Sequence, residues 1–348
     1  MNILRIRLFT LIFIFFCSTS FVIALYFGSD RINKSRNHFI RIFAPHVQKE
    51  MKSYDIGNKN WYVSGFSINS LSLNHRHYLN ALLTVNLKSY DTTMSIISIP
   101  HFSLKNPKIH IWKDNLYVLD GDQPAIYIAS INDVKHSGLV NNKYYFDMAL
   151  PTDENSFVVR FLNRRNEFTL GRLDSNKLIE APKLLQGKGD GIMSKDGILL
   201  TDNINRKIVY LSYYRNEYLV ADQNMKLLYR GKTKDTVNVS KIKVGKPDKN
   251  GNVVMASPPI VTNKLAALYN NYLFVNSALL ADNENRTFFN GSSVIDVYDI
   301  REGLYKFSFY IPDHKNKKIR EFNVFGDKLV AMFEDQCIIY ELARKYFK

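Results

Sequence analysis

Residues 190–211 of this chain have the sequence DGIMSKDGILLTDNINRKIVYL. An Asp-Gly turn begins the apolar run Gly197–Asp202, and a polar turn separates that run from a second one, Lys207–Leu211. Short runs of this kind, rich in β-branched and aromatic residues and divided by Asn, Asp, Gly and Lys, recur from residue 61 onward. Such runs are typical of antiparallel strands, and we therefore predict an all-β domain over 61–348.

An internal repeat favours one all-β architecture. A strand that ends in a turn and leads to a second strand ends at residues 120, 161 and 202, in two steps of 41 residues. The next matches, at Asn276 and Phe333, follow after steps of 74 and 57 residues. A period of about 40–45 residues with several strands per unit is typical of a β-propeller. At roughly 40–50 residues per unit, the domain is predicted to have about six blades of four-stranded antiparallel sheet.

Residues 190–211 resemble one blade of the six-bladed NHL, TolB-like and gluconolactonase/strictosidine-synthase-like propellers. Blades of that class often have the form x-G-hydrophobic-x-x-S-x-D-G-x-L-hydrophobic-x-x-D, followed by a basic residue and an apolar strand. The match is good over these 22 residues and faint over the rest of 100–345. The resemblance implies a propeller of the kind that is anchored at its N-terminus in the envelope of Gram-negative bacteria.

The same resemblance implies one candidate metal ligand. Gluconolactonase-like propellers hold a divalent metal over the central channel with Glu, Asn and Asp from different blades, and Asp190 occupies the place of one such ligand. Asn250 and Asp120 lie in loops that do not match the pattern of partner ligands. Because a hard cation needs several oxygen ligands, we interpret Asp190 as a turn residue and predict no cofactor and no catalytic residue. A Ca²⁺ or Zn²⁺ ion at the channel, with Asp190 as a ligand, is the alternative.

The N-terminus contains a candidate membrane span. Leu8–Phe27 is a stretch of twenty residues without a charge, preceded by Arg5 and Arg7. An apolar run of about 20 residues is long enough to cross a bilayer as a helix. The run continues past the small residues 18–20, so we predict an uncleaved anchor over 1–30, with a cleaved secretory signal as the alternative. Cys17 follows the bulky Phe16 and is therefore interpreted as an inert membrane-buried thiol and not as a lipidation site.

Residues 31–60 are predicted to form a juxtamembrane connector. Apolar residues recur there at near-helical spacing between basic ones, and Pro45 interrupts the pattern, which argues against one long helix. We interpret the segment as an ordinary juxtamembrane helix, and the alternative is a basic amphipathic segment on anionic headgroups. Because large domains behind a single N-terminal span are commonly translocated, we expect a bacterial inner-membrane protein with a periplasmic propeller.

The charge distribution argues against a nucleic-acid partner. The formal net charge is +15, and residues 1–60 contribute +6 of it through nine Lys/Arg and three Asp/Glu. The remaining +9 is spread without a dense basic run. With only two cysteines, the chain cannot be a disulfide-stapled scaffold or hold a Cys-based zinc cluster, and Cys337 is predicted to be a core residue.

Candidate ligand-binding residues are few. The pairs Tyr144–Tyr145, Tyr213–Tyr214 and Arg164–Arg165 are suited to a peptide or glycan surface, although aromatic residues also pack between propeller blades. His75 and His77 lie on one face of a strand, and we interpret them as a solvent-facing strand edge. We therefore predict a membrane-anchored propeller that acts as a protein- or ligand-binding or scaffolding module. The alternatives are a metal-dependent lactonase or hydrolase and a glycan-binding surface protein.

Overall fold

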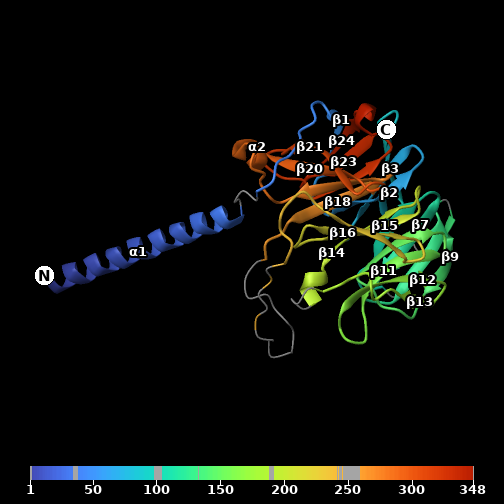
Figure 1. Ribbon diagram of the computed structural model, residues 1–348, viewed down its shortest axis with the longest axis horizontal. Coiled ribbons are helices and arrows are strands. Elements are labelled where there is room, and N and C mark those ends of the chain that lie inside the picture. The colour runs from blue at the N-terminus through green and yellow to red at the C-terminus, as the bar shows by residue number, and fades with distance from the viewer. Residues whose placement is uncertain are drawn as a thin grey trace.

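A computed structural model describes residues 2–33, 38–97, 104–131, 133–187, 192–240, 242, 245 and 259–347. The chain is a β-propeller with an N-terminal apolar helix, α1 (Asn2–Asn33), that extends away from the β-sheets (Figure 1). Asp190 lies outside the described residues, so the structure gives no position for the candidate metal ligand.

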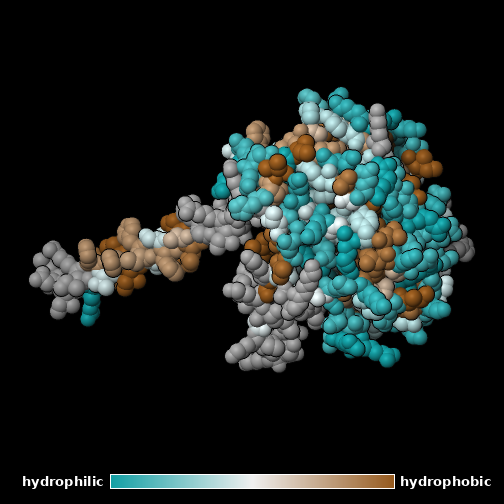
Figure 2. All heavy atoms as spheres, viewed as in Figure 1, coloured by the Kyte–Doolittle hydropathy of each residue, from teal (hydrophilic) through white to brown (hydrophobic). Residues whose placement is uncertain are grey.

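Helix α1 is apolar on all sides. Its stretch Arg7–Tyr26 has a mean hydropathy of 2.5, and none of it is buried against the rest of the protein (Figure 2). The hydroxyl groups of Ser18 and Thr19 donate to the carbonyl oxygen of Phe15 within the helix, so these polar groups need no water. The helix is long and apolar enough to cross a membrane, as a membrane span or a signal sequence is.

The described residues contain six four-stranded units, two of which are joined by parallel pairing of their first strands into one eight-stranded sheet. The first unit consists of β2 (Trp61–Ser67), β3 (Ser70–His75), β4 (Ala81–Asn86) and β5 (Thr92–Ile96). The second consists of β6 (Lys108–Trp112), β7 (Asn115–Asp120), β8 (Ala125–Ser130) and β9 (Asp133–Asn141). The third consists of β10 (Met148–Asp153), β11 (Ser156–Leu162), β12 (Phe168–Asp174) and β13 (Lys177–Glu180).

The fourth unit, which follows the 3-10 helix η1 (Ile192–Lys195), consists of β14 (Gly197–Asp202), β15 (Lys207–Ser212), β16 (Glu217–Asp222) and β17 (Leu227–Lys232). The fifth consists of β18 (Asn263–Tyr269), β19 (Tyr272–Ser277), β20 (Ser292–Asp299) and β21 (Leu304–Pro312), with the short helix α2 (Arg286–Asn290) before β20. The sixth consists of β22 (Glu321–Phe325), β23 (Lys328–Met332), β24 (Gln336–Leu342) and β1 (Gln48–Asp55), and the 3-10 helix η2 (Arg344–Tyr346) follows β24.

The two ends of the propeller meet in the sixth unit. Strand β1 pairs with β24 in antiparallel register, from Gln48 opposite Leu342 to Asp55 opposite Gln336. The ring can therefore open only if this ladder breaks. Residues 48–55 were placed in the connector on sequence grounds, but they form the outermost strand of the last sheet.

The hydrophobic core is divided among the interfaces between neighbouring units. Six apolar clusters lie between the first and second units, the second and third, and so on around to the sixth and first. In β11, Phe157 packs toward the second unit and Val158 packs toward the fourth. Because side chains alternate along a strand, a sheet buried on both faces has a continuous apolar sequence. Burial on both faces explains why the strand runs are not alternating in polarity.

The repeat found in the sequence is out of register in its second 41-residue step. The first 41-residue step leads from the end of β7 to the end of β11, and each of these is the second strand of its unit. The second step leads to the end of β14, which is the first strand of the fourth unit. The second strand of that unit is β15, which begins five residues after the end of β14. Every antiparallel pair with a short polar turn has the same local pattern, so a two-strand match does not identify the position within a blade.

Residues 38–47, named the strap here, connect α1 to β1 without helix and contain a turn at Pro45 and His46. The strap lies along the outer strand of the fifth unit, where Phe43 pairs in parallel with Ser308 and the Ala44 amide donates to the Ser308 carbonyl over 3.0 Å. The juxtamembrane helix predicted for this region is therefore wrong for residues 38–47. Arg41, one of the basic residues of the segment, is buried against the protein and so does not face headgroups.

Candidate functional site

The first strands of the six units, β2, β6, β10, β14, β18 and β22, line the central channel, which contains two hollows. One hollow has a volume of about 400 Å³ and lies beside the beginning of β2, β6 and β10. The other has a volume of about 190 Å³ and lies beside the ends of β2, β6, β14, β18 and β22. Val63 and His110 contribute to both hollows. A small polar ligand at this site would therefore contact several units at once.

The channel wall carries a small set of hydrogen-bonding groups. Glu321 Oε1 accepts hydrogen bonds from the Val63 amide at 3.2 Å and from Asn323 Nδ2 at 3.3 Å. Burial raises the pKa of Glu321 above its ordinary value. The Tyr62 hydroxyl accepts from the Ile109 amide at 2.8 Å, and burial raises its pKa to about 12. These groups link the first strands of the first, second and sixth units.

His110 is the only histidine among the residues that line the two hollows. Burial lowers the pKa of His110 to about 4, because the imidazolium ion loses its hydration inside the wall. At neutral pH the ring is therefore uncharged and offers one donor and one acceptor. Within the described part of the chain, no group of three or more His, Cys, Asp or Glu side chains is placed to hold a metal ion.

An ion-pair network joins the third and fourth units beside the larger hollow. Arg160 donates through Nε to the carboxylate of Asp147, through Nη1 to Asp196 Oδ1 at 2.6 Å and to the Tyr210 hydroxyl at 2.7 Å. Its guanidinium lies over the Phe168 ring, 4.2 Å from the centroid. Burial opposes the charge on Arg160, but the two carboxylates outweigh it and raise the pKa. Asp196, predicted as a turn residue, is therefore held by Arg160 as part of this network.

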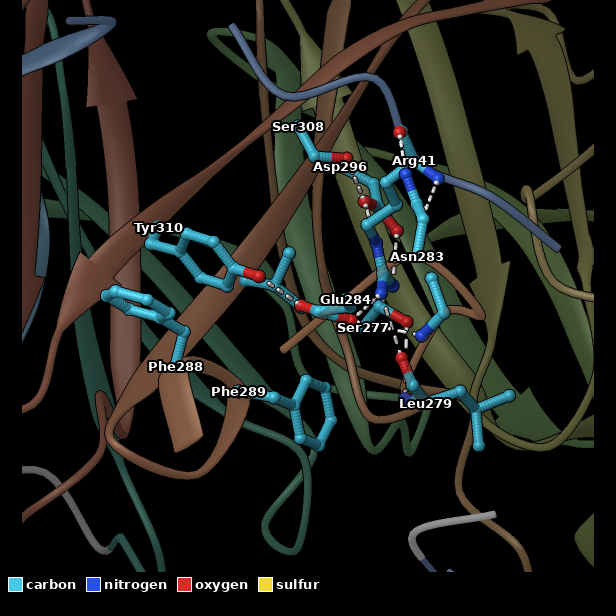
Figure 3. Close-up of polar contacts among 12 residues, drawn as sticks. Arg41, Ser277, Leu279, Asn283, Glu284, Phe288, Phe289, Asp296, Ser308 and Tyr310 are labelled. Atoms are coloured by element: carbon cyan, nitrogen blue, oxygen red, sulfur yellow. Dashed lines mark hydrogen bonds and ion pairs between the residues drawn. The ribbon is translucent and has the colours of Figure 1, made fainter. Parts of the chain in front are cut away.

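The most buried charge cluster, named the latch here, fixes the strap to the fifth unit (Figure 3). Arg41 Nε donates to Asp296 Oδ1 at 2.7 Å, and Arg41 Nη1 donates to Glu284 Oε2 at 2.6 Å. Nη1 also donates to the Leu279 carbonyl at 3.0 Å. The side chains of Arg41 and Glu284 have no exposed surface, and that of Asp296 is 4% exposed. One buried cation is thus paired with two buried carboxylates.

Further contacts hold the two carboxylates of the latch. Ser308 Oγ donates to Asp296 Oδ1, and the Tyr310 hydroxyl donates to Glu284 Oε1 at 2.7 Å (Figure 3). The strap backbone is fixed as well, because the Arg41 amide donates to Asn283 Oδ1 at 2.9 Å and Asn283 Nδ2 donates back to the Arg41 carbonyl at 2.8 Å. Burial alone would lower the pKa of Arg41, but Asp296 and Glu284 raise it. The latch therefore holds a permanently charged guanidinium.

The carboxylate partners of Arg41 are not predictable from the sequence, because they lie more than 240 residues away in the chain. The local signal that was available is the alternation in Phe39–Phe43, where a single charged residue stands at the centre of four apolar ones.

The other candidate residues are dispersed. Tyr145 is 64% exposed and Tyr214 is buried, so these two aromatic residues do not share a surface role. His77 is exposed as expected, but His75 is buried, with its ring centroid 5.2 Å from that of Trp61. Cys337 is fully buried, and burial raises its pKa to about 12, so the thiol is unreactive at neutral pH.

Comparison with known proteins supports the fold. No family model matches the sequence, and a search of curated proteins finds no match. A member of the DUF4221 family from Bacteroides vulgatus is similar in structure, with a TM-score of 0.50 and 10% identity over 85% of this chain and 97% of that one.

Two further solved structures resemble the chain. Virginiamycin B lyase from Staphylococcus aureus matches with a TM-score of 0.48 and 10% identity, over 85% of this chain and all (100%) of that one. The Cps50 (Swd1) β-propeller domain from Myceliophteria thermophila matches with a TM-score of 0.44 and 8% identity, over 85% of this chain and 100% of that one. At such low identity the likeness concerns the fold.

Proposed function

We propose that the protein is a single-pass membrane protein whose β-propeller is displayed outside the bacterial cytoplasm as a binding module. The observation that carries the proposal is the combination of an apolar helix with no surface buried in the propeller and a strap that is pinned to the propeller directly after it. A helix with an apolar surface on every side needs an apolar surrounding, and a bilayer supplies one.

The latch gives the anchor a mechanical role. Without the latch, the strap would be held to the fifth unit only by its backbone hydrogen bonds and by the packing of Phe39. With Arg41 buried against Glu284 and Asp296, a charged fixed point of the propeller lies eight residues after the end of α1 at Asn33. The propeller is thereby presented to its ligand from a defined edge.

The channel is the place that we propose for a ligand. Its hollow of about 400 Å³ is within the size range of small-molecule sites, and Tyr62 and His110 supply polar contacts along its wall. A small polar molecule, a peptide end or a sugar fits this chemistry. The alternative, a metal-dependent lactonase, depends on Asp190 and is tested by metal analysis.

Membrane insertion is tested by alkaline extraction of membranes that contain the full-length chain. We expect the wild type to stay in the pellet and Leu11→Asp/Ile14→Asp to be extracted, because each charge in mid-span costs about 2.5–3.5 kcal/mol. The matched control is Ile68→Asp/Ile204→Asp, which adds the same charges at exposed propeller positions and should stay in the pellet. Extraction of the wild type would contradict the anchor.

The side of the membrane is tested separately. An enzyme reporter fused after Lys348 is expected to be active only in its extracytoplasmic form. Activity confined to the cytoplasm would overturn the periplasmic placement and leave the anchor itself unaffected.

A further inference from the structure

The strap has its charged side chain Arg41 inside and two apolar side chains, Ile40 and Ile42, outside. Side chains alternate along this extended segment, so that Phe39 and Arg41 point into the propeller, at 6% and 2% exposure, and Ile40 and Ile42 point outward, at 58% and 60%. On a surface that faces water, the outward residues of such a segment are normally polar. The strap therefore has the polarity of a segment that faces an apolar medium.

The apolar surface continues from the strap onto helix α2. The Tyr310 ring stacks on Phe43 with a centroid distance of 4.8 Å, and Phe288 stacks on the same Tyr310 at 6.3 Å. Phe288 is 66% exposed on α2 (Figure 3). Figure 2 shows hydrophobic side chains among hydrophilic ones on the side of the propeller from which α1 extends. Ile40, Ile42, Phe43, Phe288 and Tyr310 are named the outer edge here.

The length of the chain keeps the outer edge close to the end of α1. Ile40 is seven residues after Asn33, and an extended chain spans at most about 3.6 Å per residue, so the two lie within about 25 Å of each other. The strongly apolar stretch of α1 ends at Tyr26, and the last seven helical residues rise by about 10 Å, which is comparable to the headgroup layer of a bilayer. The latch fixes Ile40 and Ile42 to the edge of the fifth unit.

The chemistry of the outer edge suits the membrane interface. Isoleucine and phenylalanine side chains enter the boundary between headgroups and acyl chains. The Tyr310 ring is suited to lie beside them, because its hydroxyl is already bonded to Glu284 inside the protein. A lipid surface thus explains the apolar side chains, the aromatic row and the nearness of α1 together.

We propose that the outer edge lies on the same bilayer that α1 spans, with Ile40, Ile42 and Phe288 in the interfacial layer. This inference rests on the proposed function, because it requires α1 to remain in the membrane. Its consequence is that the propeller is held against the membrane at two places, by α1 and by the edge of the fifth unit.

Lipid quenching of single labelled cysteines tests the inference in the full-length chain. The native Cys17 in α1 is exposed and Cys337 is fully buried, so a thiol-reactive NBD dye added in detergent labels Cys17. The test variants are Cys17→Ala/Ile42→Cys and Cys17→Ala/Phe288→Cys. The control is Cys17→Ala/Ile204→Cys, because Ile204 is 59% exposed, as Ile42 is at 60%, but lies at the channel. Each protein is reconstituted into vesicles of phosphatidylcholine and phosphatidylglycerol that carry spin-labelled phosphatidylcholine.

The expected result is loss of most of the NBD emission at positions 17, 42 and 288, and unchanged emission at position 204. Quenching at 17 without quenching at 42 and 288 would overturn the outer edge and leave the anchor intact, and the surface would then face water or a protein. Absence of quenching at 17 would contradict the anchor itself. Circular dichroism of each labelled protein shows whether the β-rich fold is retained, and the two test positions are independent of each other.

Discussion

Replacement of Arg41 by methionine tests the latch most sharply. Methionine retains the apolar stem of the side chain but removes the guanidinium group, so Asp296 and Glu284 become buried carboxylates without a cation. Removing one partner of a buried ion pair typically costs about 3–5 kcal/mol. Because the strap is only ten residues long, we expect this loss to appear first as local opening of the strap from the fifth unit.

Hydrogen exchange followed by mass spectrometry measures this opening. The Ala44 amide, which donates to the Ser308 carbonyl, reports on the strap directly. A loss of about 3–5 kcal/mol accelerates its exchange by roughly two to three and a half orders of magnitude, because 1.4 kcal/mol is a factor of ten. Amides of β11, which is far along the chain from the strap, are expected to keep their wild-type rates.

Two further variants define the result. Arg344→Met removes an exposed arginine that pairs with Asp327 at 2.8 Å and is expected to cost at most about 1 kcal/mol. Adding Asp296→Asn and Glu284→Gln to Arg41→Met removes the uncompensated charges and should restore part of the protection. An acceleration of less than about threefold in Arg41→Met, which is under roughly 0.7 kcal/mol, would refute the argument that the latch fixes the strap.

Three other predictions concern the channel. Gly65→Ala should lower the free energy of unfolding by about 1–3 kcal/mol in chemical denaturation, because its Cβ would lie 1.8 Å from the Ile111 carbonyl oxygen, whereas Gly138→Ala, with its nearest atom at 4.0 Å, should not. The lowered pKa of His110 means that the unfolded chain takes up a proton before the folded one does, so stability is lost as pH falls from 6.5 toward about 4, by up to about 3 kcal/mol. His110→Gln should remove this loss of stability at low pH, and His46→Gln should not. Thermal unfolding at several pH values measures the loss, and the argument is contradicted if both variants lose as much stability as the wild type. Elemental analysis of the purified protein should find no stoichiometric metal, whereas Ca²⁺ or Zn²⁺ that is present in the wild type and lost in Asp190→Ala would favour the lactonase alternative.

The fold was predictable because its signals are local. Each apolar run is a strand of about six residues whose turn residues are adjacent to it, and Asp202 illustrates the coupling between turn and fold. Its carboxylate accepts from the amides of Ile204 and Asn205 in its own turn, and it also accepts from the Asn271 amide of the next unit at 2.7 Å. The first two contacts can be inferred from sequence spacing, and the third cannot.

The latch and the strand β1 were not predictable for the same physical reason. Arg41 follows a membrane span, where a basic residue normally faces headgroups, and its carboxylate partners are brought to it only by the closure of the ring. Likewise, residues 48–55 form a strand because β24 offers an edge for pairing about 290 residues later in the chain. Both features depend on pairing between segments that are far apart in the chain, and the local sequence does not identify the partner segments.

The intact mass of the protein recovered from alkali-washed membranes tests the central claim most directly. The account predicts that the membrane pellet contains the full-length chain of 40.4 kDa, with α1 still attached to the propeller. Recovery of a shorter chain in the soluble fraction, beginning after the small residues 18–20, would show that the helix is a cleaved signal and would contradict the account.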